Sequence, residues 1–354
     1  MAPISMENDQ PTNLPPENLP GQENPADTEG PEILHRQHID LSHLKSAVDK
    51  VKAEISRVIV GQENFIELLL AALFTGGHAL VEGVPGIAKT LTAKLLAQTL
   101  DIDFSRIQFT PDLMPSDVVG TNVFNQKTSE FSFNPGPIFA NVILIDEINR
   151  SPAKTQAALF EVMEEMQVTV DGRTYPVDFP LFVVATQNPI EQEGTYKLPE
   201  AQLDRFIVKI EVAYPDLEEE KEILMRFQND FGLSLRKQVH KVIGPQDLIR
   251  CRELVEQVHI SIPLIEYIAA IVHRTRSHGD VYLGASPRAS LSILKIAKAL
   301  AAMQGRDFVI PEDIQAATYP VLIHRLILQP EKEIEGYEPR DVITDILQKL
   351  EVPR

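Results

Sequence analysis

Cysteine is nearly absent from this sequence of 354 residues, which contains only Cys251. A single thiol excludes a disulfide bond within the chain and fits a reducing compartment. Because Cys251 lies in a helical pattern of apolar residues, we interpret it as a buried structural thiol rather than a nucleophile.

Long apolar runs are also missing from the chain. The best candidate, Phe65–Phe74, is interrupted by Glu67, whereas a membrane-spanning helix needs about 18 or more consecutive apolar residues. The N-terminus carries Glu7 and Asp9, where a secretory signal would need basic and then apolar residues. We therefore expect no membrane insertion and a cytoplasmic location.

Positive charge is scarce as well. The chain has 33 lysine and arginine residues against 51 aspartate and glutamate residues, which gives a net charge of -18. This balance disfavours nucleic acid or an anionic membrane as a general partner, although a locally basic surface could override it. With 44% hydrophobic and 24% charged residues, the composition is that of a folded globular protein.

The length of the chain and its changes of pattern predict two folded domains behind a tail. Residues 1–34 are rich in Pro, Glu, Asn and Gln and have few large apolar residues, so we predict a disordered tail. In residues 35–213 strand-like and helix-like stretches alternate, which predicts an α/β domain with a parallel sheet covered on both faces. Only helical patterns follow Tyr214, so residues 214–354 are predicted to form a smaller all-helical domain.

Apolar periodicity predicts the individual elements. In the α/β domain, helices are expected over 41–58, 63–74, 89–100 and 151–166, and strands over 78–81, 106–110, 142–145, 182–186 and 206–212. Ser151 can cap the helix that begins there, and Pro152 fits its first turn. In the helical domain, helices are expected over 217–231, 245–258, 263–276, 287–303, 311–328 and 339–350.

Two hairpins are predicted within the α/β domain. Residues 167–178 form two short alternating stretches around Asp171 and Gly172, and Asp-Gly between such stretches is a strong signal for a two-residue hairpin turn. Residues 122–133 are a weaker case of the same pattern.

A phosphate-binding loop is predicted in the stretch 80–92, which reads LVEGVPGIAKTLT. It follows a short apolar strand and opens a helix, which is the context that such a loop needs. Its glycines let backbone N–H groups point at phosphate oxygens, and the helix N-terminus adds a favourable dipole. Lys89 would reach the β- and γ-phosphates, and Thr90 would supply a hydroxyl to Mg²⁺. Ala88 stands where the usual pattern has glycine, but a methyl group is small enough for phosphate binding to be kept.

Two acids end the apolar strand within residues 141–150, which read NVILIDEINR. They would lie at the carboxyl edge of a parallel sheet, where the ligands of such sheets bind. There Asp146 could hold Mg²⁺ opposite Thr90, and Glu147 could polarise a water molecule for attack on a phosphoryl group. The alternative is a pair of acids that caps the start of a helix. Because both motifs occur in this order, we favour nucleotide hydrolysis.

Five segments of the chain resemble the MoxR family of AAA+ ATPases, and the resemblance runs from about Leu41 to Leu328. The segments read, in order, GVPGIAKT, QFTPDLMPSDVVG, GPIFANVILIDEINR, ATQNPIEQEGTYKLPEAQLDRF and GASPRA. Ala88 is part of the family's own GxxGxAKT form. The resemblance implies an AAA+ P-loop fold with an insert in helix 2, a hairpin before the sensor strand, and a helical lid domain. It also implies that ATP and Mg²⁺ are bound by Val60, Gly61, Gly83, Val84, Pro85, Gly86, Ile87, Ala88, Lys89, Thr90 and Asp146.

The resemblance further implies roles for two polar residues. Asn188 matches the sensor-1 residue that orients water beside Glu147, although an Asn-Pro turn would explain the same letters. Arg205 matches the arginine finger that acts on the γ-phosphate of a neighbouring subunit. Its alternative is a surface salt bridge with Asp204 or Glu200.

Two more positions are assigned by the same resemblance. Arg288 matches sensor 2 at the start of a helix, where an arginine that is merely solvated would oppose the helix dipole. It could act within its own subunit or from the adjacent one. Val60 and Gly61 match the segment that lines the adenine pocket, for which a plain turn between two helices is the alternative.

Family resemblance implies a ring, most often a hexamer, that hydrolyses ATP. It also implies a chaperone-like role in the maturation or assembly of partner proteins, including partners with a von Willebrand factor A domain. A DNA-acting motor is the alternative, but its hairpins should be basic, and here Lys127 is offset by Glu130 and Arg173 by Asp171. A nucleotide-gated scaffold without turnover should have lost the loop lysine, the strand-end glutamate or the finger arginine, all of which are present.

Overall fold

The computed structural model describes residues 38–127, 129–188, 196, 198–229 and 239–353. The predicted disordered tail, residues 1–34, lies outside the described residues, as do residues 189–195 and the last two residues, 230 and 231, of the helix predicted over 217–231. Within the described ranges, no helix is long and apolar enough to cross a membrane.

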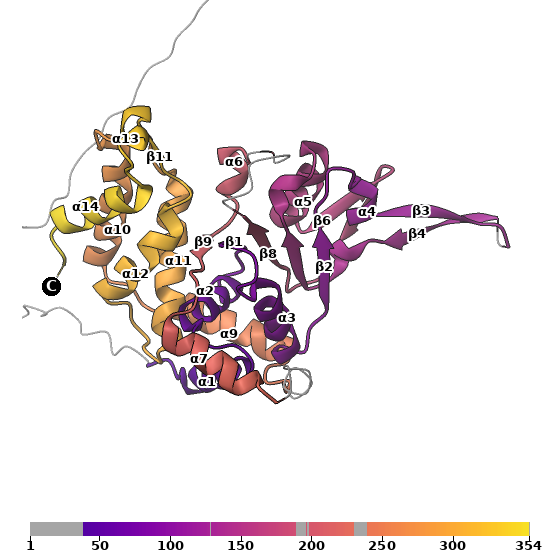
Figure 1. Ribbon diagram of the computed structural model, residues 1–354, viewed down its shortest axis with the longest axis horizontal. Coiled ribbons are helices and arrows are strands. Elements are labelled where there is room, and N and C mark those ends of the chain that lie inside the picture. Colours follow the sequence, from indigo (N-terminus) through magenta and orange to yellow (C-terminus); the bar gives the residue numbers. More distant parts are fainter. Residues whose placement is uncertain (1–37, 128, 189–195, 197, 230–238, 354) are drawn as a thin grey trace, which may run out of the picture. The chain divides into compact units, whose positions relative to one another are not determined.

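A five-stranded parallel sheet forms the centre of the α/β part (Figure 1). Its strands are β1 (Ala79–Glu82), β2 (Phe104–Gln108), β5 (Val142–Asp146), β8 (Phe182–Gln187) and β9 (Val208–Glu211). They lie in the order β2-β5-β8-β1-β9, and every residue of β5, which lies between β2 and β8, is buried. Continuous burial of this kind is typical of a parallel sheet covered on both faces. The predicted α/β fold is therefore confirmed.

Helices cover both faces of this sheet. The helices of the α/β part are α1 (Ser42–Ser56), α2 (Glu63–Phe74), α3 (Lys89–Thr99), α4 (Pro115–Val119), α5 (Ala153–Glu165) and α6 (Glu200–Leu203), with 3-10 turns η1 (Pro137–Phe139) and η2 (Ile148–Arg150). Neighbouring side chains of a strand point to opposite faces, and on β1 Val81 packs in one core with Leu69 and Leu96. Leu80 packs in a second core with Leu159.

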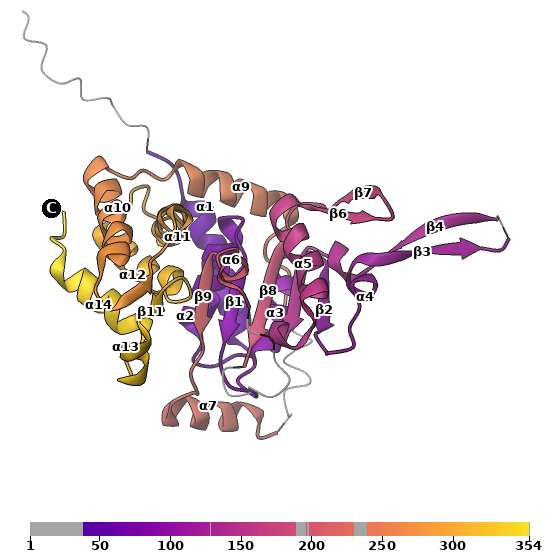
Figure 2. The same cartoon turned by 90° about the horizontal axis from the view of Figure 1, so that it is seen from above.

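Both predicted hairpins are present, and the longer one projects from the α/β part (Figures 1 and 2). The strands are β3 (Gly120–Asn125) and β4 (Glu130–Pro135) in the longer hairpin, and β6 (Gln167–Val170) and β7 (Arg173–Pro176) in the shorter one. Asp171 and Gly172 both have positive φ angles, as a type I′ turn requires. The hairpins contact each other, because Phe133 stacks on Tyr175 with ring centroids 4.1 Å apart.

The chain beyond Tyr214 is mainly helical. Its elements are α7 (Leu217–Phe227), α9 (Pro245–Gln257), α10 (Ile262–Ser277), β10 (Val281–Leu283), α11 (Pro287–Met303), α12 (Pro311–Leu322), β11 (Ile327–Leu328), α13 (Pro330–Ile334) and α14 (Pro339–Lys349). The prediction of helices alone is wrong, because β10 and β11 pair as a small antiparallel sheet. The helix expected over 311–328 ends at Leu322. Apolar residues such as Ile327 and Leu328 suit either element, so periodicity could not separate them.

The helix predicted over 217–231 also ends early, at Phe227, and α5 begins two residues later than predicted. Ser151 has an extended backbone, with φ -91° and ψ 157°, as expected for a residue before proline. Pro152 occupies the N-cap position and α5 begins at Ala153. The buried hydroxyl of Ser151 accepts and donates no hydrogen bond within the described structure, so it does not cap the helix.

One core continues from the α/β part into the helical part. Cys251 on α9 belongs to the same buried cluster as Leu69 on α2 and Ile293 on α11. Burial raises the pKa of the Cys251 thiol to about 11, so the thiol stays protonated at neutral pH and is a poor nucleophile. The interpretation of Cys251 as a buried structural thiol is confirmed.

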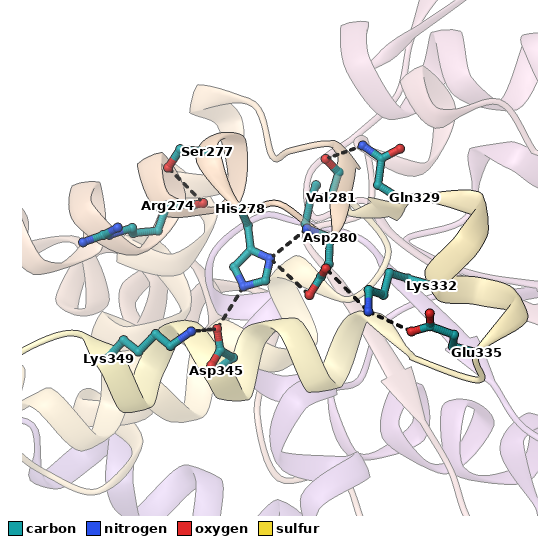
Figure 3. A network of polar contacts seen from close by, with 10 residues as sticks. All are labelled: Arg274, Ser277, His278, Asp280, Val281, Gln329, Lys332, Glu335, Asp345 and Lys349. Carbon is teal, nitrogen blue, oxygen red and sulfur yellow. Dashed lines mark hydrogen bonds and ion pairs between the residues drawn. The ribbon is translucent and has the colours of Figure 1, made fainter.

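A polar network joins the end of α10 to α14 (Figure 3). The Nε2 atom of His278 lies 2.9 Å from Oδ2 of Asp345, and the ammonium of Lys349 lies 2.7 Å from the same oxygen. Hydrogen bonds from Lys349 and His278 lower the pKa of the Asp345 carboxyl. The backbone N–H of Asp280 donates to Nδ1 of His278, so the ring proton of a neutral His278 is on Nε2. These contacts join α14, the last helix, to the segment that follows α10.

Candidate functional site

The predicted phosphate loop lies between β1 and α3, at the carboxyl edge of the sheet. Gly86 has φ +90°, and a Cβ on Gly83 would lie 2.7 Å from the carbonyl oxygen of Val212, so both positions require glycine. Ala88 has φ 62° and ψ 19°, the left-handed conformation in which glycine is normally favoured. The structure thus keeps the loop geometry expected for glycine while an alanine occupies the position.

The side chain of Lys89 lies inside this loop. Its ammonium donates a hydrogen bond to the carbonyl oxygen of Gly83. Partial burial lowers the pKa of Lys89, and the carboxylates of Asp146, Glu147 and Glu82 oppose this shift. The lysine is therefore a cation held between the loop and three acids, in position to meet a polyphosphate.

Thr90 and Asp146 face each other, as the two sequence motifs predict. The Thr90 hydroxyl lies 3.4 Å from Oδ1 of Asp146, and Thr186 donates to the same oxygen at 3.2 Å. The guanidinium of Arg106 pairs with Oδ2 of Asp146 at 2.6 Å. Hydroxyl and carboxylate oxygens are ligands that Mg²⁺ accepts, and Mg²⁺ commonly uses one or two carboxylates together with substrate phosphates. The donor set of Thr90 and Asp146 fits that ion.

Glu147 follows β5 in an unusual backbone conformation, with φ 60° and ψ 52°. Its backbone N–H donates to the hydroxyl of Thr186 at 3.1 Å. Its carboxylate accepts a hydrogen bond from Gln108 at 3.0 Å and pairs with Arg150 at 3.1 Å. Left-handed conformations of non-glycine residues are retained where the surroundings over-determine them, often at functional sites. The structure therefore holds the Glu147 carboxylate in one place at the sheet edge.

These residues line one cavity of about 440 Å³, within the range of ligand pockets. The cavity is lined by Pro85, Gly86, Ala88, Lys89, Thr90, Leu91, Arg106, Gln108, Asp146, Glu147, Thr186 and Asn188. Sequence reasoning missed Arg106, Gln108 and Thr186 as site residues. Two of them could have been predicted, because Gln108 and Thr186 lie near the carboxyl ends of β2 and β8, where the ligands of such sheets bind.

A second cavity, of about 500 Å³, borders the same phosphate loop. It is lined by Val58, Ile59, Val60, Gly61, Gln62, Pro85, Gly86, Ile87, Ala88, Leu91, Ala213, Tyr214, Pro215, Glu220, Ile223 and Phe227. Gln62 donates to the carbonyl oxygen of Ile87 at 2.7 Å, which joins the Val60-Gly61 turn to the loop. The apolar walls suit a flat aromatic base. Tyr214 and Phe227 were not predicted as site residues because neither lies in a recognisable binding motif.

Arg205 and Arg288 lie on neither of these cavities. They line a third cavity together with Glu164, Asp204 and Lys295, which we call the arginine pocket. Glu164 pairs with Arg205 at 2.5 Å and with Arg288 at 3.1 Å. The partner of Arg205 is therefore neither Asp204 nor Glu200, the salt-bridge partners considered as the alternative.

The chain around Arg205 is anchored to the helical part. The buried guanidinium of Arg325 pairs with Asp204 at 2.6 Å and donates to the carbonyl oxygen of Phe206 at 2.8 Å. Ser286, two residues before Arg288, donates to the other oxygen of Asp204 at 3.1 Å. The residues on both sides of Arg205 are thus fixed by the same region that carries Arg288.

Comparisons with known proteins agree with this architecture. Residues 78–208 match the model of the ATPase family associated with various cellular activities (AAA), and residues 273–346 match the AAA lid domain. The chain is 46% identical over 310 residues to the uncharacterized protein YeaC of Bacillus subtilis. The aligned region covers 88% of this chain and 96% of YeaC.

Two further similarities cover most of the chain. It is 44% identical over 310 residues to the chaperone MoxR1 of Mycobacterium tuberculosis, across 85% of this chain and 81% of MoxR1. A crystal structure of a candidate ATPase from Cytophaga hutchinsonii superposes with a TM-score of 0.82 at 46% identity, across 89% of this chain and 97% of that protein.

Proposed function

Because the chain belongs to the MoxR family of AAA+ ATPases, we propose that it hydrolyses ATP to ADP and phosphate. The observation that carries this proposal is the first cavity, where Lys89, Thr90, Asp146 and Glu147 meet at one sheet edge. These are the groups that phosphoryl transfer to water needs, because that reaction depends on positioning and on the offset of phosphate charge.

The residues of the first and second cavities have distinct tasks in the proposed reaction. Lys89 and the backbone N–H groups of residues 86–90 hold the phosphates, and Val60 and Gly61 contact the base. Thr90 and Asp146 hold Mg²⁺, which when bound supplies positive charge to the phosphate oxygens. Glu147 accepts a hydrogen bond from the attacking water and polarises it. Asn188, on the same cavity, orients that water.

The arginine pocket supports a reaction shared between subunits. Arg205 and Arg288 line a cavity different from the one that holds Lys89 and Glu147, so within one subunit they do not complete the site. We assign both arginines to the nucleotide of a neighbouring subunit, where fixed cations offset charge in the transition state. This arrangement requires a closed oligomer, for which we propose a hexameric ring.

The proposed role of the ring is chaperone-like remodelling of protein clients, including proteins with a von Willebrand factor A domain, in the cytoplasm. The projecting β3–β4 hairpin supports a protein partner, because Phe124 and Phe131 are 49% and 71% exposed, and exposed apolar groups favour protein contacts. DNA is not the proposed substrate, because Lys127 at this hairpin is matched by Glu130. In this proposal residues 35–213 are the motor and residues 214–354 are its lid.

The decisive test replaces Glu147 by glutamine. Glu147→Gln removes the negative charge that polarises water but keeps the shape, so we expect ATP binding to be retained and turnover to fall at least about a hundredfold. Glu165→Gln is the matched control, because it removes one exposed acid outside all three cavities, and it should leave turnover unchanged. Phosphate release and equilibrium binding of ATP are the measurements. Near-normal hydrolysis by Glu147→Gln would remove Glu147 from the reaction.

A further inference from the structure

We propose that the carboxylate of Glu164 occupies, in each subunit, the place that the terminal phosphate of a neighbour's ATP takes when the shared site closes. Glu164 would hold Arg205 and Arg288 as a preassembled pair and then release them to the phosphate. This inference rests on the proposed function, because it needs a site that two subunits share.

The geometry around Glu164 is that of one anion between two guanidinium groups. Its Oε2 pairs with Arg205 at 2.5 Å, and its Oε1 accepts from Nη2 of Arg288 at 3.1 Å. The three side chains come from separate places: the last turn of α5, the loop before β9, and the first turn of α11. A phosphoryl group, with three terminal oxygens, can make the same two contacts.

The position of Arg205 is fixed from a second side. Its Nη1 donates to the carbonyl oxygen of Phe160 at 2.6 Å, one turn of α5 before Glu164, and its guanidinium lies over the Phe160 ring, 5.7 Å from the ring centroid. Arg288 has no such second support among the described contacts, and its side chain is 58% exposed. Glu164 is therefore the group that joins the more exposed arginine to the one that is held twice.

The charges of the arginine pocket favour the exchange of Glu164 for a phosphate. Arg205, Arg288 and Lys295 line the pocket, and of its two acids Asp204 is already bound by Arg325 and Ser286. Glu164 then offers one negative charge to three cations. A terminal phosphate carries more negative charge, so it competes well for the same arginines. The Glu164 side chain is 44% exposed, so water can take its place at little cost when it leaves.

The test compares Glu164→Gln with Glu165→Gln in the ATPase assay. Without its carboxylate, Glu164→Gln no longer competes with the phosphate, so we expect the KM for ATP to fall about two- to tenfold, the range for the loss of one or two exposed ion pairs. The kcat should change less than KM. Glu165→Gln removes the same charge one residue further on, where the carboxylate accepts from Gln167 rather than from an arginine, and its KM should equal that of the unaltered protein.

A second measurement separates competition from a structural role. In a Glu147→Gln background, the additional change Glu164→Gln should tighten ATP binding by the assembled protein by the same factor. It should have no effect at protein concentrations too low for subunits to associate, because the arginines act on a neighbour's nucleotide. Equal tightening in dissociated subunits, an unchanged KM, or a loss of kcat without a fall in KM would each overturn the proposal for Glu164. Absence of turnover in the unaltered protein would instead overturn the proposed function.

Discussion

The first cavity, which contains Lys89 and Glu147 and which we call the nucleotide cavity, differs from the arginine pocket in how the chain builds it. The first is made at one edge of one sheet, from the loop after β1 and from the ends of β2, β5 and β8. The second combines the end of α5, the loop before β9 and the start of α11. The cavity is thus a property of the sheet, whereas the pocket exists only when the helical part is docked.

The two regions also differ in charge, and the difference is complementary. The nucleotide cavity contains the acids Asp146 and Glu147 beside Lys89 and Arg106. The arginine pocket has more cations than acids. Glu164 pairs with Arg205, and Asp204 pairs with Arg325. Two incomplete half-sites of this kind suit an assembly in which each subunit supplies one half to its neighbour.

The largest expected effect comes from a change that breaks one half-site at a time. Arg205→Ala should reduce turnover by about a thousandfold or more, the scale expected for an arginine finger, and Lys89→Ala should abolish it by loss of phosphate binding. Mixtures of the two variants should regain activity, because the intact Arg205 of one subunit can serve the intact phosphate loop of the other. ATPase rates across mixing ratios are the measurement.

The control for the mixing experiment is a subunit that carries both changes. Arg205→Ala mixed with the double variant Lys89→Ala/Arg205→Ala contains no intact Arg205, so it should show no rescue. If Arg205→Ala and Lys89→Ala also fail to rescue each other at every ratio, the two regions do not form a shared site.

A smaller effect is expected at His78, which lines the arginine pocket but not the nucleotide cavity. Its Nδ1 accepts from the backbone N–H of Val183, its Nε2 contacts the carbonyl oxygen of Met163 at 3.3 Å, and burial lowers its pKa to about 4. The unfolded chain binds this proton near pH 6.5, so the free energy of unfolding should fall as the pH drops from about 6.5 to about 4, by roughly 3 kcal/mol at most. Above this window His78 is neutral in both states and contributes no pH dependence.

Urea unfolding at several pH values measures this dependence. His324 is half-buried, its Nδ1 atom is fully buried, and desolvation holds its pKa well below the usual value, so it should add to the slope in the same direction. His78→Gln should therefore flatten the slope without removing it. An unchanged slope in His78→Gln would show that this ring takes up its proton in the folded protein as readily as in the unfolded chain.

The smallest effect is expected at Ala88, inside the phosphate loop. Because Ala88 has φ 62°, Ala88→Gly should relieve backbone strain and offset the entropy that glycine adds to the unfolded state. We expect the free energy of unfolding to stay equal or to rise by about 1 kcal/mol, with ATP affinity kept. Ala93→Gly in the interior of α3 is the matched control and should cost about 1 kcal/mol or more. Equal losses in both variants would contradict a strained Ala88.

Much of the fold followed from local patterns. The periodicity of apolar residues predicted α2 and α11 with the bounds that the structure has, and Asp171-Gly172 predicted the shorter hairpin. The boundary at α5 was missed because the conformation of Ser151 is set by the following proline and by a preceding 3-10 turn. The strand β11 was missed because its two residues become a strand only by pairing with β10, more than 40 residues earlier.

The sequence by itself determined the phosphate loop and the acids at the end of β5, because glycines, a lysine and an apolar strand act over a few neighbouring residues. Only the tertiary structure decided that Arg106 and Gln108 hold those acids, and that Glu164 joins Arg205 to Arg288. Glu164 lies in an ordinary helix and carries no motif. Its role arises from ion pairs between segments far apart in the chain, which no local pattern encodes.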